Sequence, residues 1–216
     1  MIFDFNQQQI QEAISSPIPD YINNLRGRDL FLKQDCFRRG KLAEIWFRDF
    51  FEFCNFQVCS NLKNGNKDID LSIMGVFLNG QSISFDRTIK IEVKTSLIPH
   101  KNFDINEQGD LKIYVNSDDP INDIDWDMGI QVYYTKFKKE WEQNIPNFDS
   151  NLISEYKKLN FSCSWVCKNA TIQYLNGLPI DKMTWQYGDK IFWHCPLKIH
   201  NHNIYEIFDL FNAYSF

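Results

Sequence analysis

The chain has 216 residues, of which 44% are apolar and 16% aromatic, so it can bury a core and is not a globally disordered protein. Its formal net charge of −5 argues against a uniformly basic nucleic-acid-binding protein, because phosphate contacts require clustered Lys and Arg. We expect a cytoplasmic protein with reduced thiols, because the N-terminus shows no secretion signal and no apolar run is long enough to span a bilayer.

The first quarter of the chain favours helices. Residues 1–30 are expected to form a short helix or arm, because Pro17 and Pro19 interrupt the chain after the first residues. Residues 38–53 carry apolar side chains on most of the circumference of a helix. This pattern predicts a helix that is buried between layers of the fold.

Two strands are predicted next. Residues 69–73 and residues 89–93 each alternate apolar and polar side chains, which is the period of a strand with one buried face. Asn79 and Gly80 supply a turn signal between them. Two such strands joined through a turn most simply pair in an antiparallel arrangement.

The rest of the chain mixes strand and helix patterns, which predicts one α/β domain over residues 1–216. We expect its core at about residues 37–135 and a β-rich and helical extension at about residues 150–216. Strands are predicted at residues 111–115, 128–135, 161–167, 171–175 and 190–199, and helices at residues 152–159 and 205–214.

Acidic residues and one lysine gather on the two predicted neighbouring strands. Asp68 and Asp70 share one face of their strand, and Glu92 and Lys94 share one face of the next. In a suitable register Asp70 and Glu92 can converge on one ion, and hard carboxylate oxygens suit Mg²⁺. Lys94 points to the same place, where it can stabilise the charge on a phosphate or help to deprotonate a metal-bound water.

Acid-x-Lys alone is a weak signal, because short motifs occur by chance. The chain has two other copies, Asp110-Leu111-Lys112 and Glu155-Tyr156-Lys157. The second of these falls on a predicted helix, where residues two apart do not share a face. Only Glu92-Val93-Lys94 lies inside an apolar strand that follows an Asp-bearing strand.

Residues 40–96 resemble the PD-(D/E)xK nuclease superfamily, which has the restriction-endonuclease-like fold. The resemblance rests on three segments in the family's order: a helix with residues 40–44, a strand with residues 68–71 and a strand with residues 91–96. It implies a central mixed β-sheet flanked by helices.

The resemblance also implies roles for particular residues. Asp70 and Glu92 would bind Mg²⁺, with Mn²⁺ as a substitute, and Lys94 would be the catalytic lysine. Glu44 on the helix would orient a water or help to hold a second ion. Asp70 is favoured over Asp68 because the family's metal-binding Asp sits within the strand, just before apolar residues.

Each of these residues also has an ordinary structural interpretation. Glu92 and Lys94 could form an ion pair on a solvated strand face, and Asp70 could be a surface acid beside a turn. Glu44 could pair with Arg48 one helical turn later. Zinc ligands are a further alternative, among Cys163, Cys167, His194, Cys195, His200 and His202, although the spacings are looser than in structural zinc sites.

Two basic clusters could contact phosphates or could be solvated surface. One contains Arg38, Arg39 and Lys41, and the other contains Lys136, Lys138 and Lys139.

These patterns favour a Mg²⁺-dependent DNA endonuclease of restriction or defence type. A repair, recombination or mobile-element nuclease and a catalytically idle nucleic-acid-binding or assembly protein with the same fold remain alternatives. Cleavage of both DNA strands needs two active sites, so a homodimer is expected. The acidic balance also favours a partner subunit that supplies DNA affinity.

Overall fold

The computed structural model describes residues 1–20, 22, 29–60, 69–114, 124–145, 151–177, 184–187 and 190–212. Asp68 and the predicted turn signal at residues 64–66 lie outside these ranges. Within them, no helix is long and apolar enough to cross a membrane.

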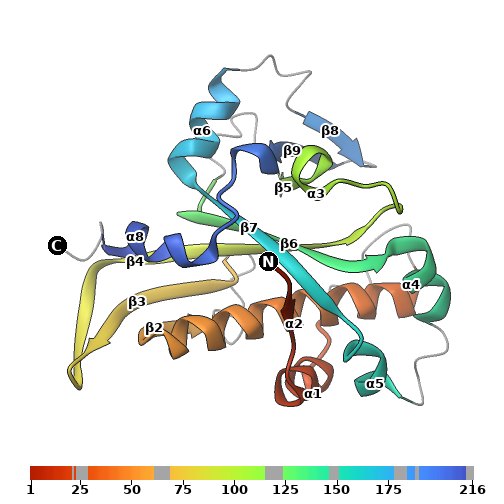
Figure 1. The fold of residues 1–216 in the computed structure, drawn as a ribbon, viewed down its shortest axis with the longest axis horizontal. Coiled ribbons are helices and arrows are strands. Elements are labelled where there is room, and N and C mark those ends of the chain that lie inside the picture. The colour runs from red at the N-terminus through yellow and green to blue at the C-terminus, as the bar shows by residue number, and fades with distance from the viewer. Residues whose placement is uncertain are drawn as a thin grey trace. The chain divides into compact units, whose positions relative to one another are not determined.

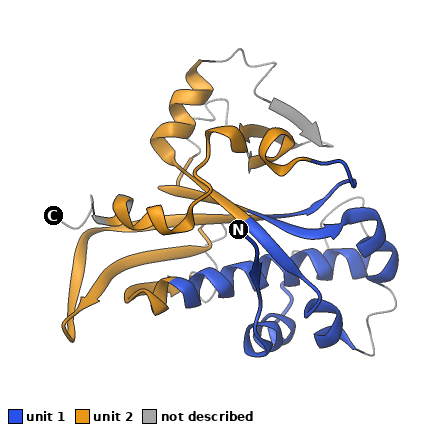
Figure 2. Cartoon of the chain, in the orientation of Figure 1, with its two compact units in different colours: residues 1–50, 95–103, 132–162 blue, residues 51–94, 104–131, 163–216 orange. Residues whose placement is uncertain are grey.

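The chain forms two compact units, which Figure 2 colours separately. Each unit combines segments that are distant in sequence, and the predicted division into arm, core and extension stays a prediction. Unit 1 contains residues 1–50, 95–103 and 132–162, and unit 2 contains residues 51–94, 104–131 and 163–216.

The described helices and strands are interspersed along the chain, several of them in consecutive pairs of one kind (Figure 1). The strands are β1 (Phe3–Asp4), β2 (Phe56–Ser60), β3 (Leu71–Leu78), β4 (Gln81–Ile98), β5 (Asp110–Tyr114), β6 (Met128–Phe137), β7 (Asn160–Cys167), β8 (Thr184–Tyr187) and β9 (Lys190–Pro196). The helices are α1 (Gln7–Ser15), α2 (Leu30–Phe53), α3 (Ile105–Gln108), α4 (Lys138–Asn144), α5 (Leu152–Tyr156), α6 (Lys168–Asn176) and α8 (Ile207–Asn212), with 3₁₀ turns η4 (Leu197–Ile199) and η5 (Ile204–Glu206).

Six strands form one sheet in the order β1-β7-β6-β4-β3-β2, and three form a second sheet in the order β5-β9-β8. The pairs β1–β7, β2–β3 and β3–β4 are antiparallel, whereas β4 and β6 run in the same direction in Figure 1. The predicted fold class is confirmed: the chain is an α/β protein with a mixed sheet flanked by helices. The closer likeness to a restriction-endonuclease-like core stays a prediction.

Helix α2 confirms a predicted helix and extends it toward the N-terminus. Its burial is partial, because Phe53, within the predicted range, is 86% exposed. The helix begins at Leu30 rather than at residue 38, after Asp29, whose Oδ1 accepts a hydrogen bond from the Leu32 backbone N at 2.8 Å. A side-chain acceptor before the first turn satisfies a backbone N–H that the helix leaves open. Leu42 and Phe47 are fully buried, as the all-round apolar pattern predicts.

A buried ionic network lies inside unit 1. Asp35 of α2 accepts hydrogen bonds from Arg39 Nε and from the Tyr156 hydroxyl, both at 2.8 Å, and from Trp141 Nε1 at 2.9 Å. The Tyr134 hydroxyl donates to the Arg39 backbone carbonyl at 2.5 Å. Burial raises the pKa of Tyr156 well above its usual value, so its hydroxyl stays a donor to the carboxylate.

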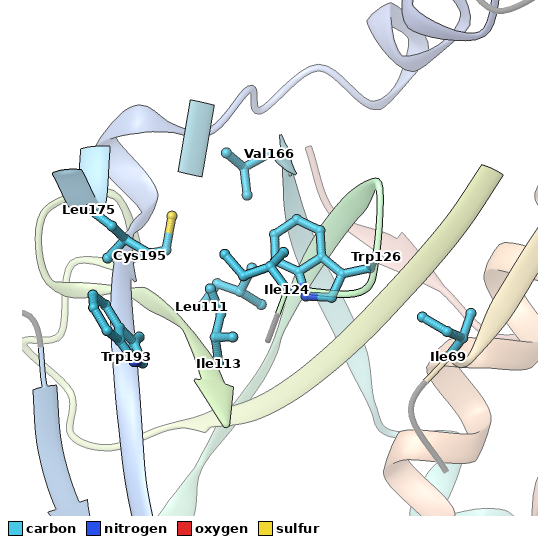
Figure 3. Packing of buried hydrophobic residues seen from close by; sticks show 9 residues of the cluster. All are labelled: Ile69, Leu111, Ile113, Ile124, Trp126, Val166, Leu175, Trp193 and Cys195. Carbon is cyan, nitrogen blue, oxygen red and sulfur yellow. The ribbon is translucent and has the colours of Figure 1, made fainter. Parts of the chain in front are cut away.

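The three-stranded sheet, which lies in unit 2, packs one face on a hydrophobic cluster (Figure 3). Strand β5 contributes alternate residues to this face, and so does its neighbour β9, in the pattern of a half-buried sheet. The cluster also contains Ile69, which directly precedes Asp70 in the chain. Its members are Ile69, Leu111, Ile113, Ile124, Trp126, Val166, Leu175, Trp193 and Cys195.

One predicted strand is wrong. Residues 171–175 lie within helix α6, where Thr171 and Leu175, four residues apart, are both buried on one face. The Thr171 hydroxyl donates to the carbonyl of Cys167 at 3.2 Å, a contact that only a helical turn allows. Short apolar segments do not distinguish helix from strand by period alone, which explains the error.

Candidate active site

Three of the four predicted site residues lie together in unit 2. Strand β3 begins directly after Asp70 and pairs with β4 in the register Leu71↔Ile91, which places Asp70 beside the Glu92–Val93 segment. The Asp70 Oδ2 atom accepts a hydrogen bond from the Val93 backbone N at 2.7 Å. The predicted antiparallel pairing is therefore confirmed, and the carboxylate of Asp70 is fixed against the strand that carries Glu92 and Lys94.

Burial of the flanking residues positions Asp70. Ile69 is 4% exposed and packs in the hydrophobic cluster of Figure 3, and Leu71 on the other side is fully buried. A residue between two anchored apolar neighbours has little freedom in its backbone. The same alternation holds in β4, where Ile91 and Val93 are buried and the side chains between them face the other way.

Glu92 and Lys94 share one face of β4, as predicted, and form an ion pair between Glu92 Oε1 and Lys94 Nζ. The side chain of Glu92 is 12% exposed and that of Lys94 is 40% exposed. The second oxygen of Glu92, Oε2, is buried. The Glu92 carboxylate is therefore largely buried, whereas the Lys94 side chain is partly exposed to solvent.

Asp70 and Glu92 together supply hard carboxylate oxygens, and this donor set fits Mg²⁺, which takes one or two protein carboxylates and keeps several waters. Among the described residues, no group of three or more His, Cys, Asp or Glu side chains is arranged to hold a metal ion. Any metal centre at this position would therefore depend on two carboxylates with water completing the coordination.

Glu44 lies in unit 1 and has a different environment. Its Oε2 atom is 3.5 Å from Lys41 Nζ, and both side chains are largely buried. The alternative partner, Arg48, instead binds Glu12 at 2.5 Å and Asp49 at 2.7 Å. Hydrogen bonds to these two carboxylates raise the pKa of Arg48, although partial burial opposes the shift.

The acids of the two other acid-x-Lys segments also form ion pairs. Asp110 of β5 pairs with Nδ1 of His194, and Lys112 lies opposite His194 in the register of β5 and β9. Glu155 is on helix α5, as predicted, and pairs with Lys158 at 2.5 Å. Strand β5 pairs with β9, which contains no Asp or Glu, and Glu155 lies on a helix, so neither copy has an acid on a paired neighbouring strand as Glu92 does.

The residues considered as zinc ligands all lie in unit 2. Burial raises the pKa of Cys163 and of Cys195 to about 12, so in the absence of a metal ion both are thiols. His200 is buried and contacts the Ser164 hydroxyl through Nδ1 at 3.2 Å. Burial lowers the pKa of His200 to about 3, so this imidazole is neutral at physiological pH.

The two basic clusters have different environments. Arg39 and Lys41 are buried in unit 1, bound to Asp35 and Glu44, so they do not offer a phosphate-binding surface. The second cluster lies beside two hollows, also in unit 1. A hollow of about 380 Å³ is lined partly by Lys138 and Lys139, and one of about 400 Å³ partly by Lys136.

Sequence reasoning missed Asp35, a buried carboxylate of unit 1 that accepts hydrogen bonds from three side chains. The four-residue spacing of Asp35 and Arg39 on a helix was a usable signal for an ion pair. The other two donors, Trp141 and Tyr156, are more than 100 residues away, and no local pattern indicates them.

Comparison of the chain with models of protein families, with curated proteins and with solved structures found no significant match.

Proposed function

We propose that the chain is a Mg²⁺-dependent DNA endonuclease whose active site contains Asp70, Glu92 and Lys94. The observation that carries this proposal is the hydrogen bond from the Val93 N–H to the Asp70 carboxylate, beside Glu92 and Lys94 on the same strand. It brings two carboxylates and one ammonium group onto two neighbouring strands, which supports the proposal.

Each residue has a separate role in the proposed reaction. Asp70 and Glu92 would hold the metal ion, which supplies Lewis-acid activation of a water and of the scissile phosphate. Lys94, the more exposed of the pair, would neutralise the negative charge that develops on the phosphate oxygens. The water oxygen bonds to phosphorus, the phosphodiester P–O bond to one sugar oxygen breaks, and that oxygen leaves with a proton from water.

The test is cleavage of plasmid DNA by the purified chain with and without Mg²⁺. The variant Lys94→Ala should lose activity by about a hundredfold or more, because it removes a group that acts on the charge of the transition state. Lys112→Ala is the matched control, since Lys112 belongs to a second acid-x-Lys segment on an exposed strand position, and it should cleave like the unmodified chain.

Equal cleavage by the unmodified chain and Lys94→Ala would refute the site. If the unmodified chain binds DNA without cutting it in Mg²⁺ or Mn²⁺, the idle binding protein becomes the better interpretation. Preference for branched or single-stranded DNA over plasmid would favour a repair or recombination nuclease.

A further inference from the structure

A hollow of about 400 Å³ lies along one side of helix α4 in unit 1, and we call it the α4 hollow. Phe137, at the N-cap of α4, lines it together with Glu140, Trp141 and Asn144. Spacings of three, four and seven residues place these side chains on one side of the helix. The volume is within the range of pockets that hold small molecules, about 300–1,000 Å³.

Trp141 is the buried part of this lining, with 5% of its surface exposed. Its Nε1 atom donates to Asp35 Oδ1 at 2.9 Å, and its ring meets the ring of Tyr156 edge-on, with 5.9 Å between the centroids. These contacts fix the indole, so one aromatic wall of the hollow is formed before any ligand binds. Phe137 adds a second ring, which is partly exposed.

Glu140 and Asn144 add hydrogen-bonding groups to the same lining, and both side chains are exposed. The Asn144 Nδ2 atom donates to the Glu140 backbone carbonyl at 2.8 Å, which orients the amide. An ionised carboxylate offers only acceptors, whereas an amide offers both donors and an acceptor. Groups of these two kinds recognise the edges of bases that carry an amino group.

Lysines supply positive charge at the α4 hollow. Lys136 lines it and forms no ion pair with any residue in the described ranges. Lys158 also lines it and pairs with Glu155 at 2.5 Å. The ammonium group of Lys101 lies 5.8 Å from the centroid of the Phe137 ring. An anionic group of a ligand can therefore bind Lys136 without displacing an existing ion pair.

We propose that the α4 hollow binds a nucleotide whose base carries an amino group. The flat base would pack against Phe137 and Trp141, its amino group would donate to Glu140, and its phosphate would bind Lys136. A purely apolar ligand would leave the charged groups without partners, and a simple anion would leave the aromatic rings uncovered. A nucleotide has a flat ring, hydrogen-bond donors and an anionic group, so it complements all three kinds of lining residue.

This site goes beyond the proposed function and does not rest on Asp70, Glu92 or Lys94. It lies within unit 1, whereas those three residues lie in unit 2. The nucleotide can be a free mononucleotide or an unpaired nucleotide of a nucleic-acid strand, because both present the same base and phosphate.

The test is isothermal titration calorimetry of the full chain with nucleotides in EDTA, so that metal-dependent cleavage plays no part. AMP and CMP should bind. UMP has a carbonyl group where CMP has its amino group, and it should bind about tenfold more weakly than CMP. Cytidine, which lacks the phosphate, and ribose 5-phosphate, which lacks the base, should each also bind about tenfold or more weakly.

Two substitutions separate the contacts to the phosphate from those to the base. Lys136→Ala should weaken CMP binding by about tenfold and leave the weaker binding of cytidine unchanged, because it removes only a phosphate contact. Glu140→Gln should abolish the preference for CMP over UMP, because an amide can donate to the UMP carbonyl. Lys157→Ala is the matched control, since Lys157 is an exposed lysine outside the lining, and it should bind CMP like the unmodified chain.

A single-stranded oligocytidylate, titrated beside CMP, distinguishes the two sources of the nucleotide. Tighter binding of the oligonucleotide, lost in Lys136→Ala, would assign the hollow to an unpaired nucleotide of a strand, and tighter binding of CMP would assign it to the free mononucleotide. The proposal is overturned if neither AMP nor CMP binds, if UMP binds as tightly as CMP, or if Lys136→Ala binds CMP like the unmodified chain.

Discussion

In unit 1 the carboxylate of Asp35 is buried and accepts hydrogen bonds from three side chains, whereas in unit 2 the carboxylate of Glu92 pairs with Lys94, whose side chain is 40% exposed. Both are acids beside a cation within the same chain. The first has a complete set of donors inside the protein, and the second lies where a solvent-borne ligand can reach its partner.

This difference predicts which residues contribute to the stability of the fold and which contribute to the reaction. A buried ion pair with full hydrogen bonding fixes the arrangement of the elements that supply its donors, here α2, α4 and α5. An acid–lysine pair near the surface can instead exchange its partner for a metal ion or a phosphate. Substitutions in the Asp35 network should therefore change stability, and those at Asp70, Glu92 and Lys94 should change activity.

The two units also differ in net charge. Unit 1 contains 13 Lys and Arg and 11 Asp and Glu, whereas unit 2 contains 10 Lys and Arg and 17 Asp and Glu. The unit with the candidate site is thus the acidic one, and its carboxylates repel a polyanion until a divalent cation binds. Unit 1, with its exposed lysines at residues 138 and 139, offers the less repulsive surface for DNA.

The largest expected loss of stability is in unit 1. Asp35→Ala leaves the Arg39 guanidinium buried without its counter-charge, so the free energy of unfolding should fall by about 3–5 kcal/mol. Urea denaturation measures this change. Asp70→Ala is the matched substitution in unit 2 and should cost about 1 kcal/mol, since it removes one hydrogen bond at a partly exposed position. Equal losses in the free energy of unfolding of both variants would contradict the assignment of Asp35 to stability and of Asp70 to the reaction.

In unit 2, a smaller loss of stability should be accompanied by a loss of cleavage, because a buried residue lies next to Asp70. Ile69→Ala removes a buried side chain next to Asp70, so it should lower the free energy of unfolding by about 3 kcal/mol and also weaken cleavage. Ile69→Val retains most of the packing and should cost about 1 kcal/mol. Cleavage by folded Ile69→Ala at the full rate would show that this contact does not position Asp70.

Unit 2 should also show a pH dependence of stability, through His200. Burial lowers the pKa of His200 to about 3, below its value of about 6.5 in the unfolded chain. Between these values the unfolded chain binds a proton that the folded chain does not, so the free energy of unfolding falls as the pH falls. The slope due to this residue is at most about 1.4 kcal/mol per pH unit.

Urea denaturation at several pH values between 3 and 6.5 measures this slope, and His200→Gln should flatten it. Parallel curves for the unmodified chain and His200→Gln would mean that the imidazole titrates normally in the folded protein.

Much of the sheet around the candidate site was predictable because its residues alternate strictly. Ile89, Ile91 and Val93 are buried, which turns Glu92 and Lys94 to one face as expected. The hydrogen bond from Val93 to Asp70 was not predictable, because register depends on the bulge and turn of the hairpin rather than on composition.

Other features depend on contacts that no local pattern contains. The basic segment at Arg38, Arg39 and Lys41 suggested a phosphate-binding surface, but two of its three cations are buried against acids of the same helix. Residues 171–175 form part of helix α6 rather than the expected strand. Thr171 and Leu175, four residues apart, are both buried on one face of this helix. In both cases tertiary packing overrode a local preference.

The most direct test of the proposed metal site at Asp70 and Glu92 is Mn²⁺ binding, measured by electron paramagnetic resonance, because this measurement needs no DNA substrate. Asp70→Asn and Glu92→Gln should each weaken binding by about tenfold or more, whereas Asp110→Asn, a carboxylate paired with His194, should bind like the unmodified chain. If all four proteins bind Mn²⁺ equally, or none binds it, Asp70 and Glu92 are not a metal site and the account is wrong.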